Sequence, residues 1–273
     1  MGSKEGLANL ASAITAPGDL ALVPNPTYPI HAYGFMIAGG TLRHIPSIHN
    51  GVFDPEEYMN SLSRAVAHSI PKPIAIVISF PSNPTAQLCD LDFYKELVTF
   101  AKKHSIWILS DLAYAEIYFE DNPPPSILQI EGAKEISVEF TSMSKTFSMA
   151  GWRVGFAVGN KHLINALTRI KSYLDYGAFT PVQVAAVEAL NSPKSYIDRI
   201  RNEYKNRRDT LISAMSRAGW EIPKPSATMF AWAPLPKKFQ NLGSMEFAKI
   251  LMQEAEVAVA PGIGFGEYGE GFV

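Results

Sequence analysis

The sequence is poor in the features that mark several classes of protein. Its single cysteine, Cys89, excludes an intramolecular disulfide and favours a reducing, cytoplasmic location. Its 24 basic and 26 acidic residues nearly cancel, so it lacks the strongly basic face that a nucleic-acid partner requires. No apolar run is long enough to span a bilayer, and the N-terminus lacks a signal-peptide pattern. We therefore expect a cytoplasmic globular protein without nucleic-acid or membrane partners.

The residues that are present favour an α/β fold. With 47% hydrophobic residues among 273, the chain can build one large domain or two modest ones. Short β-rich runs predict strands at residues 20–23, 41–45, 74–79, 105–110, 136–140 and 154–159. Helical patterns alternate with them, at residues 5–16, 55–67, 91–104 and 161–175. Because IAIVIS and IWILS are almost continuously apolar, we predict a mostly parallel sheet covered by helices.

The pattern changes at about Pro193. A charged helix is predicted at residues 196–217, followed by a strand, TMFAWA, at 228–233 and a helix at 245–254. We therefore predict a large domain at residues 1–190 and a smaller α+β domain at residues 191–273. Both ends of the chain are abrupt, so we expect the N-terminal part of the first domain and part of the second to be missing.

Lys145 lies in TSMSKTFSMAGWRVGF, a stretch with few other charges. The plain interpretation is an ordinary loop lysine. However, the small hydroxyl residues and methionines around it favour the neutral amine, which is the nucleophile that a Schiff base needs. Ser142, Ser144 and the fork-shaped guanidinium of Arg153 are suited to hold a phosphate. Together these residues indicate a phosphate-bearing aldehyde, namely pyridoxal phosphate.

Further polar groups follow the predicted strands, at the sheet edge where ligands collect in parallel sheets. Asp111 is a turn or cap aspartate if taken alone, but beside Lys145 it is a partner for a protonated pyridine nitrogen. Tyr114 either packs or donates to the ring hydroxyl. Asn83 lies in an Asn-Pro turn from which its amide would reach the same ligand.

The N-terminal part offers two more candidates. Ser3 is predicted to cap the first helix, and the free amides of Ser3 and Lys4 would bind phosphate at its N-terminus. Tyr28 lies in PNPTYPIH, a proline-stiffened loop after a strand. Its ring either stacks on a planar ligand or packs against the protein.

Eight stretches share the motifs of one family, in that family's order: SKEGLANL, PNPTYPIH, FPSNPTAQ, SDLAYAEI, TSMSKTFSMAGWRVGF, IKSYLDYGAFTPVQVAA, TMFAWA and APGIGFGEYG. The sequence resembles the class I/II, fold type I aminotransferases, and closely resembles their alanine aminotransferase-like branch. The resemblance implies a mostly parallel, seven-stranded type of sheet sandwiched by helices, with a partial small α+β domain. It also implies a homodimer in which residues 172–177 lie near the partner's cofactor and Tyr176 approaches the partner's phosphate or substrate.

The resemblance further implies a role for each candidate. Lys145 would form the Schiff base with pyridoxal phosphate and shuttle the proton, and Asp111 would bind the pyridine nitrogen. Tyr114 and Asn83 would hydrogen-bond the ring hydroxyl, and Tyr28 would stack on the ring.

The phosphate would be held by Ser142 and Arg153, with the amides of Ser3 and Lys4. The peptide bond before Pro84 would be cis, and no metal is expected. Three members of the family's site are not in this chain: a glycine and a tyrosine upstream, and a downstream arginine that clamps the substrate carboxylate.

Several functions stay open at this point. The leading one is an aminotransferase that moves an amino group between an amino acid and a 2-oxo acid, with alanine and 2-oxoglutarate as the expected pair. LL-diaminopimelate or aspartate aminotransferase, or a β-lyase on the same scaffold, are alternatives. The non-enzymatic alternatives are a pyridoxal-phosphate-binding sensor domain and a catalytically dead fragment.

Overall fold

The fold is known from a computed structural model, which describes residues 2–49 and 51–273. The strands are β1 Leu20–Asn25, β2 Thr41–Pro46, β3 Pro73–Ser79, β4 Trp107–Asp111, β5 Ser137–Ser142 and β6 Gly155–Gly159. The helices are α1 Gly2–Ile14, α2 Pro29–Ile37, α3 Pro55–Ala67, α4 Leu91–His104, α5 Met143–Thr146, α6 Lys161–Leu174, α7 Thr180–Leu190, α8 Lys194–Arg217 and α9 Ser244–Glu254. Short 3-10 helices lie at Ile127–Gln129, Ala133–Glu135, Ala150–Trp152, Lys237–Leu242, Gly262–Phe265 and Glu267–Gly269.

The strands form one sheet in the order β2-β1-β3-β4-β5-β6. The first five are parallel, and β6 pairs antiparallel with β5. The predicted mostly parallel α/β sheet is therefore confirmed. Among the described residues the sheet has six strands, one fewer than the seven-stranded type that the resemblance implied. Strand order reverses at β1, and such a reversal opens a crevice at the carboxyl ends of the strands.

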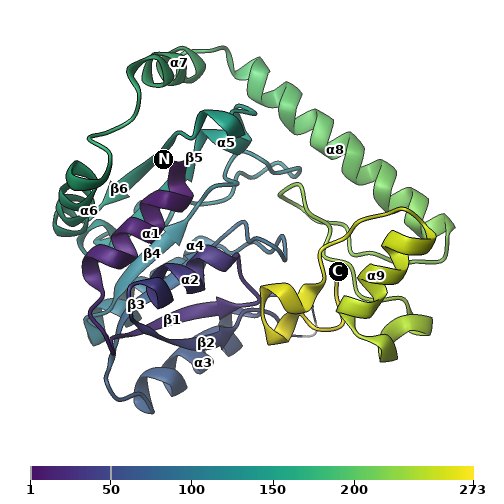
Figure 1. Ribbon diagram of the computed structural model, residues 1–273, viewed down its shortest axis with the longest axis horizontal. Coiled ribbons are helices and arrows are strands. Elements are labelled where there is room, and N and C mark those ends of the chain that lie inside the picture. The colour runs from purple at the N-terminus through teal and green to yellow at the C-terminus, as the bar shows by residue number, and fades with distance from the viewer. Residues whose placement is uncertain (1, 50) are drawn as a thin grey trace.

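Each central strand contributes residues to two apolar clusters, because successive side chains point to opposite faces of the sheet. Ile76 and Ile78 of β3 pack against α3 and α4, whereas Ala75 and Val77 pack on the other face, where α1 and α6 lie. Figure 1 shows these helices on the two sides of the sheet. Burial on both faces explains the nearly continuous apolar runs in the sequence.

All six strands predicted between residues 20 and 159 are found, with ends that differ by no more than two residues. The predicted helices at residues 55–67 and 91–104 match α3 and α4. Both begin after an aspartate whose carboxylate caps the first turn: Asp54 accepts from Glu57 N and Asp90 from Phe93 N.

The strand predicted at residues 228–233 was wrong. Thr228 has a φ of 69°, which takes the chain out of the extended conformation. The backbone bonds of the segment also go to separate partners, because Thr228 N donates to Ile117 O and Ala233 N donates to Val273 O. The segment therefore lies between two isolated β-bridges and is not part of a sheet, although its residues are typical of strands.

Three helices were missed, namely α2, α7 and the short α5, and one cap was wrong. Helix α2 begins at Pro29, in the stretch predicted to be a loop, because proline is tolerated in the first turn of a helix. Helix α7 begins at Thr180 and has a proline as the second residue of its first turn. Ser3 does not cap α1, since the helix begins at Gly2 and Ser3 lies inside its first turn.

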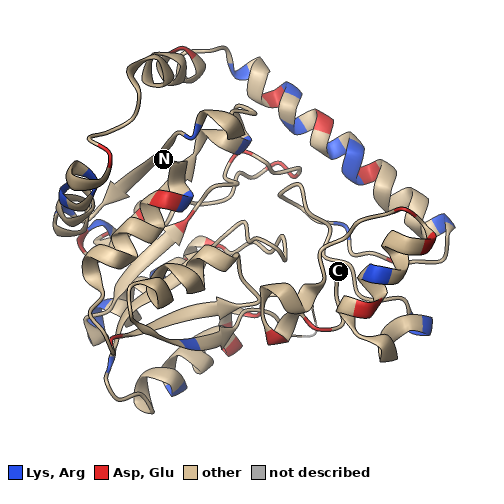
Figure 2. Ribbon diagram, viewed as in Figure 1, with Lys and Arg blue, Asp and Glu red and all other residues tan. Residues whose placement is uncertain are grey.

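Helix α8 leads from α7 to the C-terminal region (Figure 1). Basic and acidic residues are interspersed along it (Figure 2). The C-terminal region has its own apolar cluster around Phe247 and Leu235. It returns to the sheet where Tyr268 N donates to Asn25 Oδ1 at the end of β1. A domain boundary near residue 190 remains a prediction. No helix in the described ranges is long and apolar enough to cross a membrane.

Candidate active site

A cavity of about 230 Å³ lies at the carboxyl ends of the parallel strands. The loops or ends of four strands reach it: β1 through Tyr28, β3 through Asn83, β4 through Asp111 and β5 through Ser142. The structure brings all nine predicted site residues to this cavity: Ser3, Lys4, Tyr28, Asn83, Asp111, Tyr114, Ser142, Lys145 and Arg153. Ser144, Ala113, Ala150 and Phe230 line it as well.

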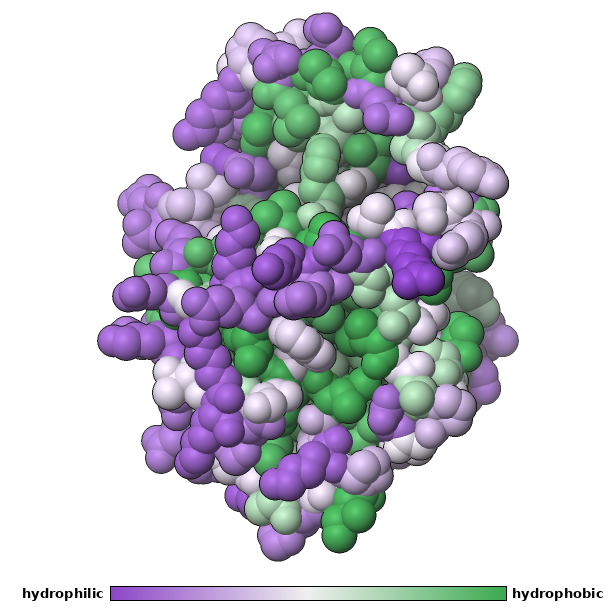
Figure 3. Space-filling model, turned by 90° about the vertical axis from the view of Figure 1, so that its left-hand side faces the viewer, coloured by the Kyte–Doolittle hydropathy of each residue, from purple (hydrophilic) through white to green (hydrophobic). Residues whose placement is uncertain are grey.

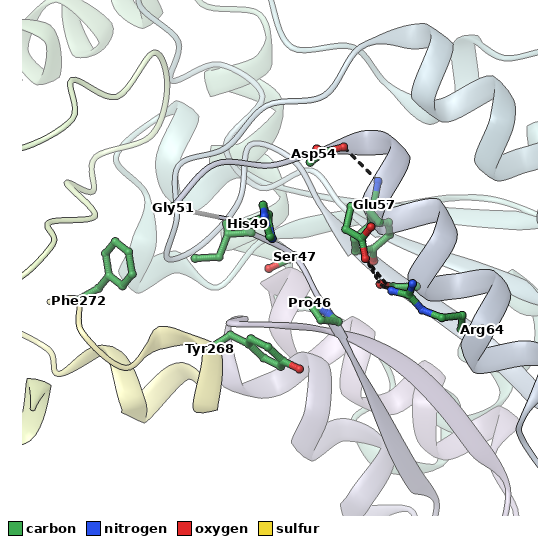
Figure 4. Close-up of a pocket in the computed structure, with 12 residues that line it drawn as sticks. Pro46, Ser47, His49, Gly51, Asp54, Glu57, Arg64, Tyr268 and Phe272 are labelled. Carbon is green, nitrogen blue, oxygen red and sulfur yellow. Dashed lines mark hydrogen bonds and ion pairs between the residues drawn. The ribbon is translucent and has the colours of Figure 1, made fainter.

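A larger cavity, of about 380 Å³, lies between α3 and the C-terminal segment (Figure 4). Three of its polar residues are bonded to one another: the Asp54 carboxylate accepts from Glu57 N, and the Glu57 carboxylate accepts from Arg64 at 2.6 Å. None of the predicted residues is among the described residues that line it. The smaller cavity is therefore the candidate active site.

Lys145 lies in the short helix α5, which follows β5 directly. Its side chain is half-buried. Its Nζ lies 5.8 Å from the centre of the Tyr114 ring. The amine thus points into the cavity toward Tyr114, which follows β4.

Asp111 contacts two groups at the end of β4. Its Oδ1 accepts from Ala113 N at 3.2 Å, and its Oδ2 lies 3.0 Å from Nε2 of His31. His31 is completely buried, and its Nδ1 lies 2.6 Å from Oγ1 of Thr27. The orientation of the carboxylate is therefore fixed by its own loop and by α2.

Tyr114 and Asn83 are joined to each other. Asn83 Nδ2 donates to the Tyr114 hydroxyl at 3.3 Å. Burial, together with the nearby Asp111 carboxylate, raises the pKa of Tyr114 well above its usual range. The phenol therefore keeps its proton at neutral pH and can donate it in a hydrogen bond. The expected cis peptide bond between Asn83 and Pro84 is confirmed.

Tyr28 immediately precedes α2 and lines the cavity. Its ring meets the His31 ring edge to face, with centroids 5.9 Å apart and an angle of 80°. Lys4 Nζ lies 5.3 Å from the centre of the Tyr28 ring. The ring is thus held by α2 on one side and faces the first turn of α1.

The other end of the cavity is rich in donors. The side chain of Ser142 caps α5 by accepting from Ser144 N at 3.2 Å, and its own hydroxyl proton remains able to donate. Arg153 adopts a left-handed backbone conformation with φ 59° and donates from Nη1 to Ala150 O. The first amides of α1 have no acceptor within the helix.

Two glycines let these donors approach one another. A Cβ on Gly2 would lie 2.6 Å from Arg153 Nη2, and one on Gly155 would lie 2.6 Å from Ser3 N. A larger residue at position 155 would collide with the backbone of α1, and one at position 2 would displace the Arg153 guanidinium. The arrangement gathers amides, hydroxyls and a guanidinium, as an anion site requires.

Three residues of the site were not predicted from the sequence. His31 and Thr27 lie four residues apart in the quoted PNPTYPIH region, and a helix starting at Pro29 would have indicated that they form a pair. Phe230 was assigned to a strand, although it lines the cavity beside Tyr114.

Residues 1–273 match the family described as Aminotransferase class I and II. The chain belongs to this family. Class I and II aminotransferases are pyridoxal-phosphate enzymes of fold type I, in agreement with the sheet and its covering helices.

Related proteins support the same assignment. AatC of Rhizobium meliloti (strain 1021) is 62% identical over 273 residues, covering 100% of this chain and 66% of the relative. Glutamate-pyruvate aminotransferase AlaC of Escherichia coli (strain K12) is 49% identical over 270 residues, covering 99% of this chain and 64% of the relative. An LL-diaminopimelate aminotransferase of Natranaerobius thermophilus is 43% identical, covering 100% and 68%.

Among solved structures, substrate-bound BacF of Bacillus subtilis superposes with a TM-score of 0.92 at 35% identity, covering 100% of this chain and 67% of BacF. An aminotransferase from Staphylococcus aureus has a TM-score of 0.90 at 31% identity, covering 100% and 70%. The chain thus spans about two thirds of the length of these relatives.

The residues of the candidate active site fit pyridoxal phosphate. The cofactor needs an amine for its aldehyde, an acid for its ring nitrogen and donors for its phosphate. Lys145, Asp111 and Arg153 supply these groups from one cavity. The glycine-permitted approach of α1 to Arg153 supplies the phosphate end with backbone amides as well.

Proposed function

We propose that this protein is an aminotransferase that uses pyridoxal phosphate to move an amino group between an amino acid and a 2-oxo acid. The observation that carries the proposal is the convergence of Lys145, Asp111 and Arg153 on one cavity at the strand ends. The bound cofactor supplies a carbonyl that links to amines and a ring that withdraws electrons from them.

Lys145 would hold the cofactor through its amine, and the same amine would move the proton of the substrate Cα. Its half-buried place in α5 lets Nζ reach the middle of the cavity. Asp111 holds the proton on the ring nitrogen, because its carboxylate is oriented by Ala113 N and His31.

The remaining residues bind and orient the ring. Tyr114 and Asn83 bind the ring hydroxyl, and Tyr28 stacks on a ring face. Ser142 and Arg153, with the amides of Ser3 and Lys4, hold the phosphate.

Alanine with 2-oxoglutarate is the proposed substrate pair. It is supported by the 49% identity with a glutamate-pyruvate aminotransferase. LL-diaminopimelate is the second candidate, supported by the 43% identity with an aminotransferase named for that substrate. A cytoplasmic location, favoured by the single cysteine, is proposed with them.

We further propose that the protein acts as a homodimer. Large apolar side chains are exposed on α6, α7 and the turn between them: Tyr173, Leu174, Tyr176, Phe179, Val184 and Val187. Figure 3 views the molecule from the side on which α6 lies and shows apolar atoms among polar ones there. Tyr176 is 95% exposed in the single chain, which suits a side chain that approaches the partner's cofactor.

Borohydride trapping tests the cofactor and the lysine. The protein is incubated with pyridoxal phosphate, reduced and digested, and the phosphopyridoxyl group is located by tandem mass spectrometry. We expect one labelled site, at Lys145, and its loss in Lys145→Ala. Lys4→Ala is the matched control, since Lys4 lines the same cavity, and it should keep the label on Lys145. Labelling at Lys4, or scattered over surface lysines, would contradict the proposal.

A further inference from the structure

A further cavity, of about 300 Å³, lies between α8 and residues 225–231 and is named the second cavity, as distinct from the one beside α3. Of the described residues that line this cavity and the candidate active site, Phe230 alone is common to both. The Phe230 ring therefore forms a wall between the two spaces.

The segment after Tyr114 fixes the position of Phe230. Thr228 N donates to Ile117 O at 2.7 Å, and Phe119 N donates to Ser226 O at 2.9 Å. Thr228 is almost completely buried, and its hydroxyl accepts from Phe230 N. The Phe230 ring then meets the Tyr114 ring edge to face, with centroids 5.3 Å apart. Because one loop carries Tyr114 and anchors Phe230, the wall keeps its place relative to the site.

The second cavity has charges that are already paired. The buried Arg208 guanidinium contacts Asp209 at 2.9 Å and donates to Pro225 O. Arg207 donates to Glu203 at 2.8 Å. Much of the remaining lining is apolar or aromatic and includes Tyr204, Leu211 and Met229. A space of this kind suits an apolar side chain better than a carboxylate, whose burial would need an uncommitted cation.

We propose that Phe230 determines substrate size by closing the second cavity to the side chain of the amino-acid substrate. The inference rests on the proposed aminotransferase function. With Phe230 in place the site takes amino acids with small side chains. Without the ring, the second cavity joins the site and accepts bulky apolar side chains such as those of leucine and phenylalanine.

The test measures amino-acid binding to the cofactor-loaded full chain. Binding is monitored through the change in cofactor absorption, in the absence of a 2-oxo acid. The dissociation constants of L-alanine and L-leucine are compared in the wild type and in Phe230→Ala. We expect the preference for leucine over alanine to rise about tenfold or more, because each buried methylene adds to affinity. Phe230→Leu, which keeps part of the wall, should give a smaller rise and decides the matter if Phe230→Ala does not fold.

A second substitution separates this effect from general loosening of the site. Leu211→Trp in α8 refills the second cavity, so Phe230→Ala/Leu211→Trp should return to the wild-type preference. Leu211→Trp alone should leave alanine binding unchanged. An unchanged preference in the Phe230 variants, while alanine still binds, would overturn the proposal and leave the aminotransferase function intact. No response of the wild type to any amino acid would overturn both.

Discussion

Nε2 of His31 lies 3.0 Å from Oδ2 of Asp111, and the imidazole is completely buried. If Nε2 carries the proton it donates to Asp111, and Nδ1 then accepts from the Thr27 hydroxyl at 2.6 Å. This chain of bonds ties the candidate acid at the end of β4 to the first turn of α2. His31 is therefore a positioning residue that acts on the cofactor through Asp111.

Replacing His31 should slow catalysis without preventing cofactor attachment. In His31→Phe the Asp111 carboxylate loses a partner, and a hydrogen bond to a charged group contributes about 1.5–3 kcal/mol. We expect turnover to fall about 10- to 100-fold, while borohydride still labels Lys145. His31→Gln, which keeps a donor, should recover part of the loss and alter the pH profile less than His31→Phe does.

Tyr33→Phe is the matched control, because Tyr33 lies on the same helix with its side chain 55% exposed. It should have no effect on turnover. Equal turnover in His31→Phe and the wild type would show that Asp111 needs no support from α2.

Asp111→Ala should leave the cofactor bound but nearly abolish transamination. The phosphate donors and Lys145 do not depend on Asp111, whereas the ring loses the carboxylate that keeps its nitrogen protonated. Removing a charge partner of a reacting group costs about 100-fold or more in rate. Cofactor content is read from absorbance, and turnover from coupled 2-oxo acid release.

Two substitutions refine the Asp111 prediction. Asp111→Asn preserves the shape and the bond from Ala113 N without the charge, so it should be nearly as slow as Asp111→Ala. Asp111→Glu keeps the charge and should be the fastest of the three. Near-wild-type turnover in Asp111→Ala would show that another group holds the ring nitrogen.

The sheet and much of the site could be predicted because the relevant signals are local. A strand buried on both faces is a run of apolar residues, as in β3 and β4, whatever packs on it. The carboxyl ends of parallel strands meet at one edge, so Asn83 and Asp111 could be expected there together without knowledge of the loops.

The parts that failed depend on partners distant in sequence. Residues 228–233 have β-forming side chains, but Thr228 bonds to Ile117 and its positive φ breaks the extended chain. Helix α2 was not predicted because the sequence does not distinguish a proline in the first turn of a helix from a proline in a loop. The link between His31 and Asp111 spans 80 residues, and no local pattern encodes it.

Glu139 offers a prediction about stability that is independent of the cofactor. It is a carboxylate in the middle of β5, only 7% exposed, that accepts from Ser110, Ser126 and Ile127 N. Burial raises the pKa of Glu139, and the three hydrogen bonds only partly oppose this rise. The folded protein therefore binds a proton at pH values where the unfolded chain has already released it.

The sign of the pH dependence follows from this raised pKa. The stabilisation associated with the Glu139 proton is fully present below the ordinary glutamate pKa and is lost as the pH rises through the raised value. Glu139→Gln cannot ionise. We therefore expect the unfolding free energy of the wild type, minus that of Glu139→Gln, to fall as the pH rises from about 4.3 and then to level off. Urea unfolding of both proteins from pH 4 to 8 measures this difference. The contributions of the other carboxyl groups are the same in both proteins and cancel in it. A difference that stays constant or grows with pH would mean that Glu139 is ionised as easily in the fold as in the unfolded chain.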